Sequence, residues 1–199
     1  EVGFGFFEFI GANCIHFQGF SIVADRSSNF PQFGLLGGRK TGNGSSGSHT
    51  FQDVFVLGKF SKAAQFMLSS ETNKFDNCWY YPQIGNGCVM AMNNLPWTVT
   101  PKYGTLGSGL GGNGNNQFEN CYFLSADEAS IGDVMLALEY AQDFRLTSCY
   151  FASSIQASHV FLRKSASGTI ENCFFEKYGS FDPYSVYFAP DDGTDPSDY

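Results

Sequence analysis

A short apolar phrase recurs along the chain with a constant spacing. An apolar residue is followed by a second three positions later and by a third two positions after that. Four copies carry cysteine in the middle: Phe75/Cys78/Tyr80, Phe118/Cys121/Phe123, Leu146/Cys149/Phe151 and Ile170/Cys173/Phe175. Two earlier stretches fit without it: Phe17/Phe20/Ile22 and Phe51/Val54/Val56. Neither a helix nor a flat strand produces a spacing of three and then two.

The residue just before the middle apolar position is a turn former in every copy. These residues are Gly19, Asp53, Asn77, Asn120, Ser148 and Asn172. Glycine and short polar residues tolerate left-handed backbone conformations better than other residues do. Each phrase therefore predicts a strand, a one-residue corner and a second strand. We also expect Asn77, Asn120 and Asn172 to form a ladder of side-chain amides, interrupted by Ser148.

Between the phrases lie stretches in which apolar residues alternate with others, as in a strand. They are 6–10, 33–36, 64–69, 88–92, 133–140, 158–164 and 184–190. Alternation predicts that Val134, Leu136, Leu138, Val160 and Leu162 point inward, and that Met135, Ala137, Glu139, His159, Phe161 and Arg163 point outward. Pairing Leu138 with Leu162 places Glu139 beside Arg163. This pair is either a cross-strand salt bridge or a substrate-binding pair.

Taken together, these patterns predict an all-β chain that forms one parallel solenoid domain over residues 1–199, with about six coils and three strands per coil. Equivalent inward residues would stack about 4.8 Å apart from coil to coil. An antiparallel sandwich of short strands is the alternative. We expect a long inserted loop at 93–116 and an acidic tail at 190–199. The strand-like start at 3–11, without an initial Met, favours a piece of a longer protein.

Composition supports a β-rich chain with many turns, because there are 23 Gly and 22 Phe and only 15% charged residues. The net charge of −8 argues against nucleic-acid partners, and no apolar run has the length needed for membrane insertion. The six Cys form no CxxC pair and the three His are scattered, so we expect no metal site. The cysteines are interpreted as small buried hydrophobic residues rather than disulfide partners.

The corner phrases, written F-x-N-C-x-F, resemble those of right-handed parallel β-helices of the pectate-lyase-like superfamily. The stretch FSKAAQFMLSSETNKFDNCWYY at 60–81 most resembles the β-helical bodies of bacteriophage tailspikes. This resemblance implies a homotrimer in the virion, assembled in the host cytoplasm, that binds bacterial surface polysaccharide and often cleaves it. The alternatives are a secreted pectate-lyase-like carbohydrate-active enzyme and a purely structural solenoid.

No catalytic motif marks a site, so the candidates rest on residue chemistry. Trp97 and Tyr103 in the long loop suit stacking on sugar rings, although Trp97 would equally suit covering the coil. A polysaccharide hydrolase needs two carboxylates, and the candidates are Asp127, Glu128, Glu139 and Asp143. A lyase needs a base and a cation, for which His159, Tyr140 and Arg163 are the candidates. The chemistry implies no cofactor.

Overall fold

The computed structural model describes most of the strands and corners of the chain. The described residues are 5–24, 33–38, 46–60, 63–68, 70–84, 88–92, 113–124, 134–139, 141–153, 158–163, 167–177 and 184–189. Within these ranges the regular secondary structure is entirely β, and no helix is long and apolar enough to cross a bilayer.

One side of the molecule is a seven-stranded sheet in which every pair of neighbours is parallel. Its strands, in spatial and chain order, are β1 (Gly5–Ile10), β3 (Phe33–Gly38), β6 (Ala63–Leu68), β10 (Cys88–Met92), β14 (Val134–Glu139), β18 (Ser158–Arg163) and β21 (Tyr184–Ala189). These are the seven alternating stretches of the sequence. The structure confirms each of them within one or two residues at most ends.

The facing side is a ten-stranded parallel sheet that bends at the predicted corners. Before the corner it contains β8 (Lys74–Asp76), β12 (Gln117–Glu119), β16 (Phe144–Thr147) and β19 (Gly168–Glu171), and after it β9 (Trp79–Ile84), β13 (Tyr122–Leu124), β17 (Tyr150–Ser153) and β20 (Phe174–Lys177). Two strands, β2 (His16–Ala24) and β5 (Thr50–Phe60), run through the corner without a break. Because β5 pairs with both β8 and β9, it joins the two halves into one sheet.

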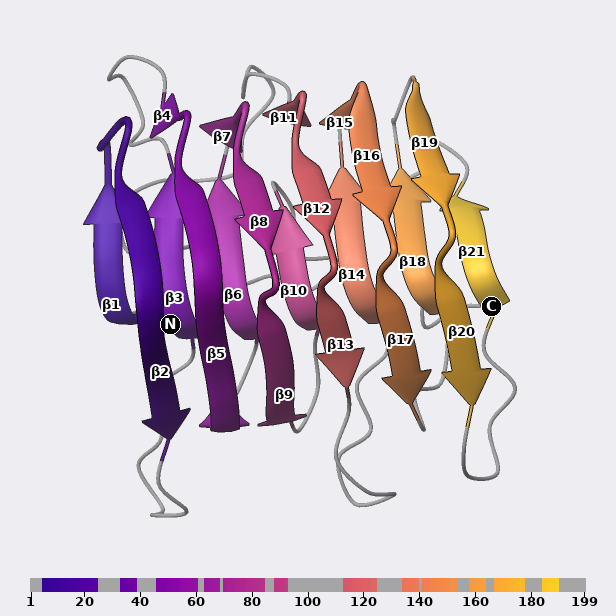
Figure 1. Ribbon diagram of the computed structural model, residues 1–199, viewed down its shortest axis with the longest axis horizontal. Helices are drawn as coiled ribbons and strands as arrows, with labels where there is room; N and C mark the ends of the chain where they lie inside the picture. The colour runs from indigo at the N-terminus through magenta and orange to yellow at the C-terminus, as the bar shows by residue number, and fades with distance from the viewer. Residues whose placement is uncertain are drawn as a thin grey trace.

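The directions in which the chain runs through the two sheets determine the handedness of the solenoid. The strands of the seven-stranded sheet run up behind, those of the ten-stranded sheet run down in front, and each coil lies nearer to the C-terminal end (Figure 1). This path is a right-handed parallel β-solenoid, the hand that parallel crossover connections almost always take. The predicted fold class is thereby confirmed.

All six predicted corner residues have left-handed backbone. Their φ angles are 66° at Gly19, 53° at Asp53, 50° at Asn77, 53° at Asn120, 53° at Ser148 and 54° at Asn172. A single left-handed residue reverses which side of the chain the next side chain points to, so the apolar residues before and after it both face the core. The spacing of three and then two follows directly from this geometry.

A second column of left-handed residues lies at the turn that follows the seven-stranded sheet, and the apolar pattern did not predict it. Its members are Cys14, Ser48, Thr72, Asn115 and Asp143, with φ between 53° and 57°. Two-residue strands precede four of them: β4 (Ser46–Gly47), β7 (Ser70–Glu71), β11 (Asn113–Gly114) and β15 (Ala141–Gln142). Polar residues occupy most of these positions, so hydrophobic periodicity carries no signal there.

The core is built from columns of like residues. Phe17, Phe51, Phe75 and Phe118 stack with ring centroids 4.8, 4.7 and 4.5 Å apart and planes within 5° of parallel. Such offset stacking adds to the gain from burying each ring. A second core column consists of the free thiols that directly follow the corner residues in the chain: Cys78, Cys121, Cys149 and Cys173. Each thiol donates to a carbonyl of the preceding coil, as from Cys78 to Phe51 (3.3 Å) and from Cys121 to Phe75 (3.5 Å).

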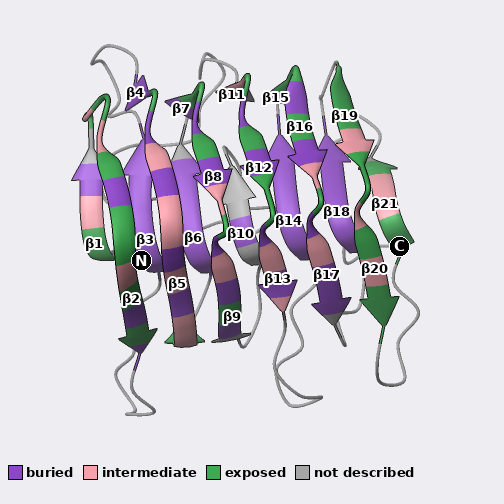
Figure 2. Ribbon diagram, viewed as in Figure 1, coloured by how far each residue is buried: buried purple, intermediate pink, exposed green. Residues whose placement is uncertain are grey.

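In the middle strands β3, β6, β14 and β18, the described side chains on both faces of the sheet are buried, which differs from the predicted outward exposure, whereas the end strands β1 and β21 keep exposed residues (Figure 2). The alternation is also interrupted. Met135 and Leu136 both belong to the inner cluster, whereas Val134 is buried outside it. His159 likewise points inward, because its ring lies 5.7 Å from that of Phe175 on the opposite sheet. The inward assignment of Val134 and the outward assignments of Met135 and His159 were therefore wrong.

Candidate functional site

A column of aromatic side chains runs along the outer side of the ten-stranded sheet. Each residue directly follows the middle apolar position of a phrase, and the strand register aligns them from coil to coil. We call this set the outer aromatic column: Phe55, Trp79, Tyr122, Tyr150 and Phe174. The first four are half-buried and Phe174 is 57% exposed, so the column is accessible along its length.

The rings of this column are not uniformly stacked. Trp79 and Tyr122 stack with centroids 4.2 Å apart, and Tyr150 and Phe174 stack at 5.4 Å. Between these pairs the planes turn by 49°, and Phe55 is turned by 52° from Trp79. Rings in a uniform stack would expose only their edges, whereas a turn of about 50° between neighbours exposes part of a ring face. Such faces pack against the apolar faces of sugar rings.

A second outward column extends the apolar surface on the side away from the corner. Leu57 pairs with Tyr81, and Leu124 with Ala152. Tyr81 is 41% exposed, and Val23, which pairs with Leu57, is 67% exposed. The two columns together form an uncharged strip from Val23 to Ala152, and the exposed Glu176, which pairs with Ala152, ends it.

On its other side the aromatic column borders a polar corner, which we define as Asp53, Asp76, Asn77, Glu119, Asn120, Ser148, Glu171 and Asn172. The corner amides bond to carboxylates and not to each other: Asn77 donates to Asp53 (2.7 Å) and Asn120 to Asp76 (3.4 Å). The predicted amide ladder at this corner is replaced by these amide–carboxylate bonds. Lys74 forms an exposed ion pair with Glu119 at 3.5 Å.

An amide ladder does form inside the core, at residues that directly follow the second column of left-handed residues. Asn73 donates to the Asn116 side-chain oxygen (2.8 Å), and that oxygen also accepts the backbone N–H of Asn73 (3.0 Å). His49 completes this column, its Nδ1 accepting from the Ile15 N–H at 3.3 Å and its Nε2 lying 3.2 Å from the Ser46 hydroxyl. Burial lowers the pKa of His49, so the ring is neutral near pH 7.

Two of the predicted site residues meet as expected. Glu139 and Arg163 occupy paired positions on β14 and β18, and their side chains form an ion pair at 3.0 Å. Both side chains are more than 90% buried, which makes them a structural cross-strand pair and not an open binding pair. A buried carboxylate held by a guanidinium is poorly placed to serve as a hydrolytic acid or base.

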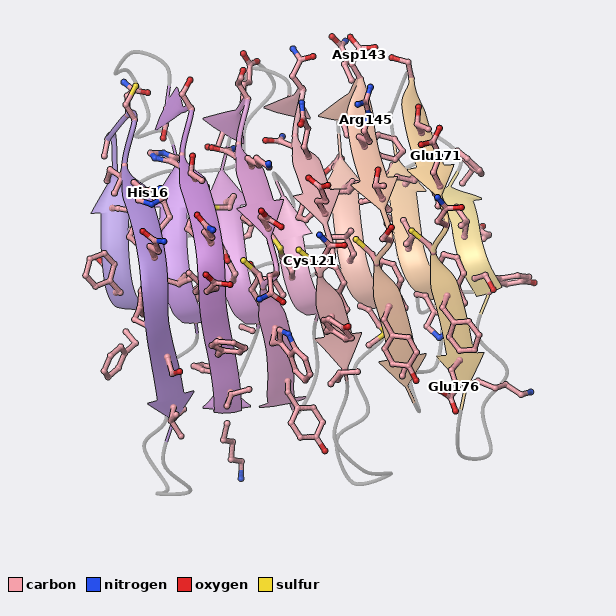
Figure 3. All side chains as sticks on the ribbon, in the orientation of Figure 1. His16, Cys121, Asp143, Arg145, Glu171 and Glu176 are labelled. Atoms are coloured by element: carbon pink, nitrogen blue, oxygen red, sulfur yellow. The ribbon has the colours of Figure 1, made fainter. Side chains whose placement is uncertain are left out.

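Asp143 lies away from this ion pair, directly before the first residue of β16. Glu176 lies near the C-terminal end of β20 (Figure 3). The Asp143 carboxylate accepts a hydrogen bond from the Ser167 hydroxyl at 2.5 Å, and its backbone φ of 53° places it in the second corner column. Its described role is that of a turn residue. Five other predicted residues lie outside the described residues: Trp97, Tyr103, Asp127, Glu128 and Tyr140.

The outer aromatic column and the polar corner were not predicted as a site, although the signal is readable. The position after each middle apolar residue is Phe, Trp, Tyr, Tyr or Phe in five successive coils. Among the residues that the structure describes, no group of three or more His, Cys, Asp or Glu side chains is arranged to hold a metal ion.

The fold and this surface define the chain as a right-handed parallel β-solenoid that carries the outer aromatic column beside the polar corner. No protein-family model, curated protein or solved structure matched the chain in comparisons with each. The function must therefore be argued from the surface itself.

Proposed function

We propose that the chain is a tailspike-like receptor-binding solenoid that holds an extended bacterial surface polysaccharide along the outer aromatic column. The observation that carries the proposal is the recurrence of an aromatic residue, half-buried in four coils and exposed in the fifth, at one outward position from Phe55 to Phe174. A long and repetitive ligand, such as a polysaccharide, could contact every ring of this column.

The polar corner supports the same ligand. Sugars present hydroxyl groups around an apolar ring face, so their sites combine aromatic rings with planar hydrogen-bonding groups. Asp76, Asn120 and Glu119 offer such groups beside Trp79 and Tyr122. Hydroxyl groups donate to carboxylates and accept from amides, so both members of the corner pairs are suitable partners.

Cleavage, homotrimer formation and a place in the virion tail belong to the proposal as expectations from the resemblance. Incubation with a panel of capsular and O-antigen polysaccharides, followed by chain length and ultraviolet absorbance, tests for cleavage. Shortening with a new unsaturated chromophore means a lyase, and shortening without it means a hydrolase. Sedimentation equilibrium tests the trimer. A monomeric depolymerase would favour the secreted pectate-lyase-like alternative.

Binding is tested by replacing aromatic residues of the column. Trp79→Ala and Tyr122→Ala should each weaken polysaccharide binding by up to about tenfold, because aromatic contacts contribute about 0.5–1.5 kcal/mol. Gln117→Ala is the matched control, because Gln117 is exposed on β12 before the corner. Unchanged affinity in both aromatic variants, with loss in Trp97→Ala, would place the site in the 93–116 loop instead.

A structural assembly role is the second candidate, and the last coil favours it. Ile170, Cys173 and Phe175 occupy core columns but are only partly buried, whereas Leu146, Cys149 and Phe151 one coil earlier are fully buried. On β21, Phe188 is 72% exposed. This end therefore suits a further β-layer stacked on it. Phe188→Lys should lower any self-association seen by light scattering, and equal association in both proteins would argue against this role.

A further inference from the structure

A buried histidine lies inside the coil formed by β18, β19 and β20. His159 is 2% exposed and packs on the ring of Phe175. Its Nε2 lies 3.1 Å from the backbone carbonyl oxygen of Glu176 on β20. The side chain therefore ties the seven-stranded sheet to β20 through the core.

The hydrogen bonding assigns the proton of the neutral ring. A carbonyl oxygen only accepts, so Nε2 must donate and Nδ1 carries no proton. Nδ1 is buried and has no hydrogen-bond partner among the described residues. A second proton would place a charged N–H in the core, where only the Tyr184 backbone offers a further favourable interaction, and burying that charge is costly. Consistently, burial lowers the pKa of His159, and the backbones of Glu176 and Tyr184 only partly offset this.

Neighbouring charges do not compensate for a protonated ring within the described part of the chain. Glu139 on β14 and Arg163 on β18 pair with each other on the outer face of their sheet. The Glu176 carboxylate accepts from the Tyr150 hydroxyl on the exposed surface. The other titratable or charged groups on the elements packed around the ring are the Cys149 and Cys173 thiols, which donate to carbonyls, the exposed Glu171 on β19, and Lys177, Tyr184 and Tyr187.

The strand that His159 holds also carries the end of the outer aromatic column. Phe174 stacks on Tyr150, and Glu176 bonds to the hydroxyl of the same tyrosine. We propose that protonation of His159 loosens β20 and so disorders the C-terminal end of the outer aromatic column in acid. The consequence, weaker grip on polysaccharide at low pH, rests on the proposed function. The loosening of β20 itself does not.

The solenoid supplies matched variants for this position. In the equivalent inward position one coil earlier stands Met135, so His159→Met is compatible with the core. His159→Gln keeps an N–H donor for the Glu176 carbonyl and removes the titration. Two different replacements keep the test decisive if one of them fails to fold.

Hydrogen exchange of the full chain, read by mass spectrometry at pH 8 and pH 5 and corrected for intrinsic rates, measures the loosening. Protection of 174–177 in the unmodified protein should fall by up to about tenfold for each pH unit between about 6.5, the unfolded value, and the lowered folded pKa of His159, and should level off below that pKa. Protection in His159→Met or His159→Gln should not change with pH, and 74–80 should serve as the internal reference. Equal loss in the unmodified protein and in both variants would overturn the proposal.

Polysaccharide binding at the same two pH values separates the two claims. Weaker binding at pH 5 in the unmodified protein, abolished by His159→Gln, supports both. If β20 loosens in acid and no polysaccharide binds at either pH, the proposed function fails and the acid sensitivity stands. If binding occurs and falls equally in the variant, His159 does not regulate the site.

Discussion

Glu139 and Arg163 lie side by side on β14 and β18, with 3.0 Å between carboxylate and guanidinium and with both side chains buried. A buried ion pair strongly penalises loss of either partner, because the other charge is then left without compensation. It need not stabilise the fold relative to an apolar pair of similar size.

Arg163→Met should therefore lower the free energy of unfolding by about 3–5 kcal/mol, since it leaves the Glu139 carboxylate buried alone. The double variant Glu139→Leu/Arg163→Met should lose clearly less. Urea denaturation of the single and double variants measures this. An equal loss in both would mean that packing, not charge, is the main contribution at this site.

The corner predicts opposite results for two replacements of one residue. Asn120→Val should cost about 1–3 kcal/mol, because a β-branched residue is strained at φ 53°. Asn120→Gly should cost less than about 1 kcal/mol, as Gly19 already occupies the same corner position. Both variants lose the hydrogen bond to Asp76. The difference in unfolding free energy between them therefore measures the cost of placing a β-branched residue in left-handed backbone.

The thiol column predicts strongly unequal reactivity. Burial holds the pKa of Cys121 well above its usual value, so this thiol should react with a thiol reagent only after denaturation. Cys14 is exposed and should react in the native protein. Cys121→Val should change stability by less than about 1.5 kcal/mol, because Val54 fills the same column. Rapid labelling of Cys121 in the native state would contradict the described core.

His49 makes the stability of the early coils depend on pH. Its pKa is lowered in the folded protein, so its contribution is present above about 6.5, the unfolded value, and is lost as the pH falls through the folded pKa. His49→Asn places in the column the residue already found at Asn73 and Asn116. The difference in unfolding free energy between the unmodified protein and this variant should shrink or change sign below pH 6. A constant difference would show that His49 does not titrate.

The regular part of the fold could be predicted because every coil repeats the same physical demand. Corner residues such as Asn77 must adopt left-handed backbone while their neighbours face the core, which imposes a spacing that survives in the sequence. The pairing of Glu139 with Arg163 followed from the same register.

Other features were not predicted from the sequence because they follow no simple period of apolar residues. Met135 and Leu136 both face inward, and strict alternation cannot express this, so His159 was assigned to the wrong face. The second corner column uses polar residues such as Thr72 and Asn115, which hydrophobic spacing does not detect. The outer aromatic column was overlooked because Trp79 and Tyr122 stand between apolar core positions and resemble ordinary strand residues.

The arrangement of coils has a mechanical consequence. The strands run across the solenoid, so the hydrogen bonds that join neighbouring coils point along its axis, from β1 at one end of the sheet to β21 at the other. Tension applied across the axis loads many of these bonds in shear at once. Tension applied between the two ends separates the coils one at a time, so the protein should yield at a far lower force along its axis and in steps of one coil.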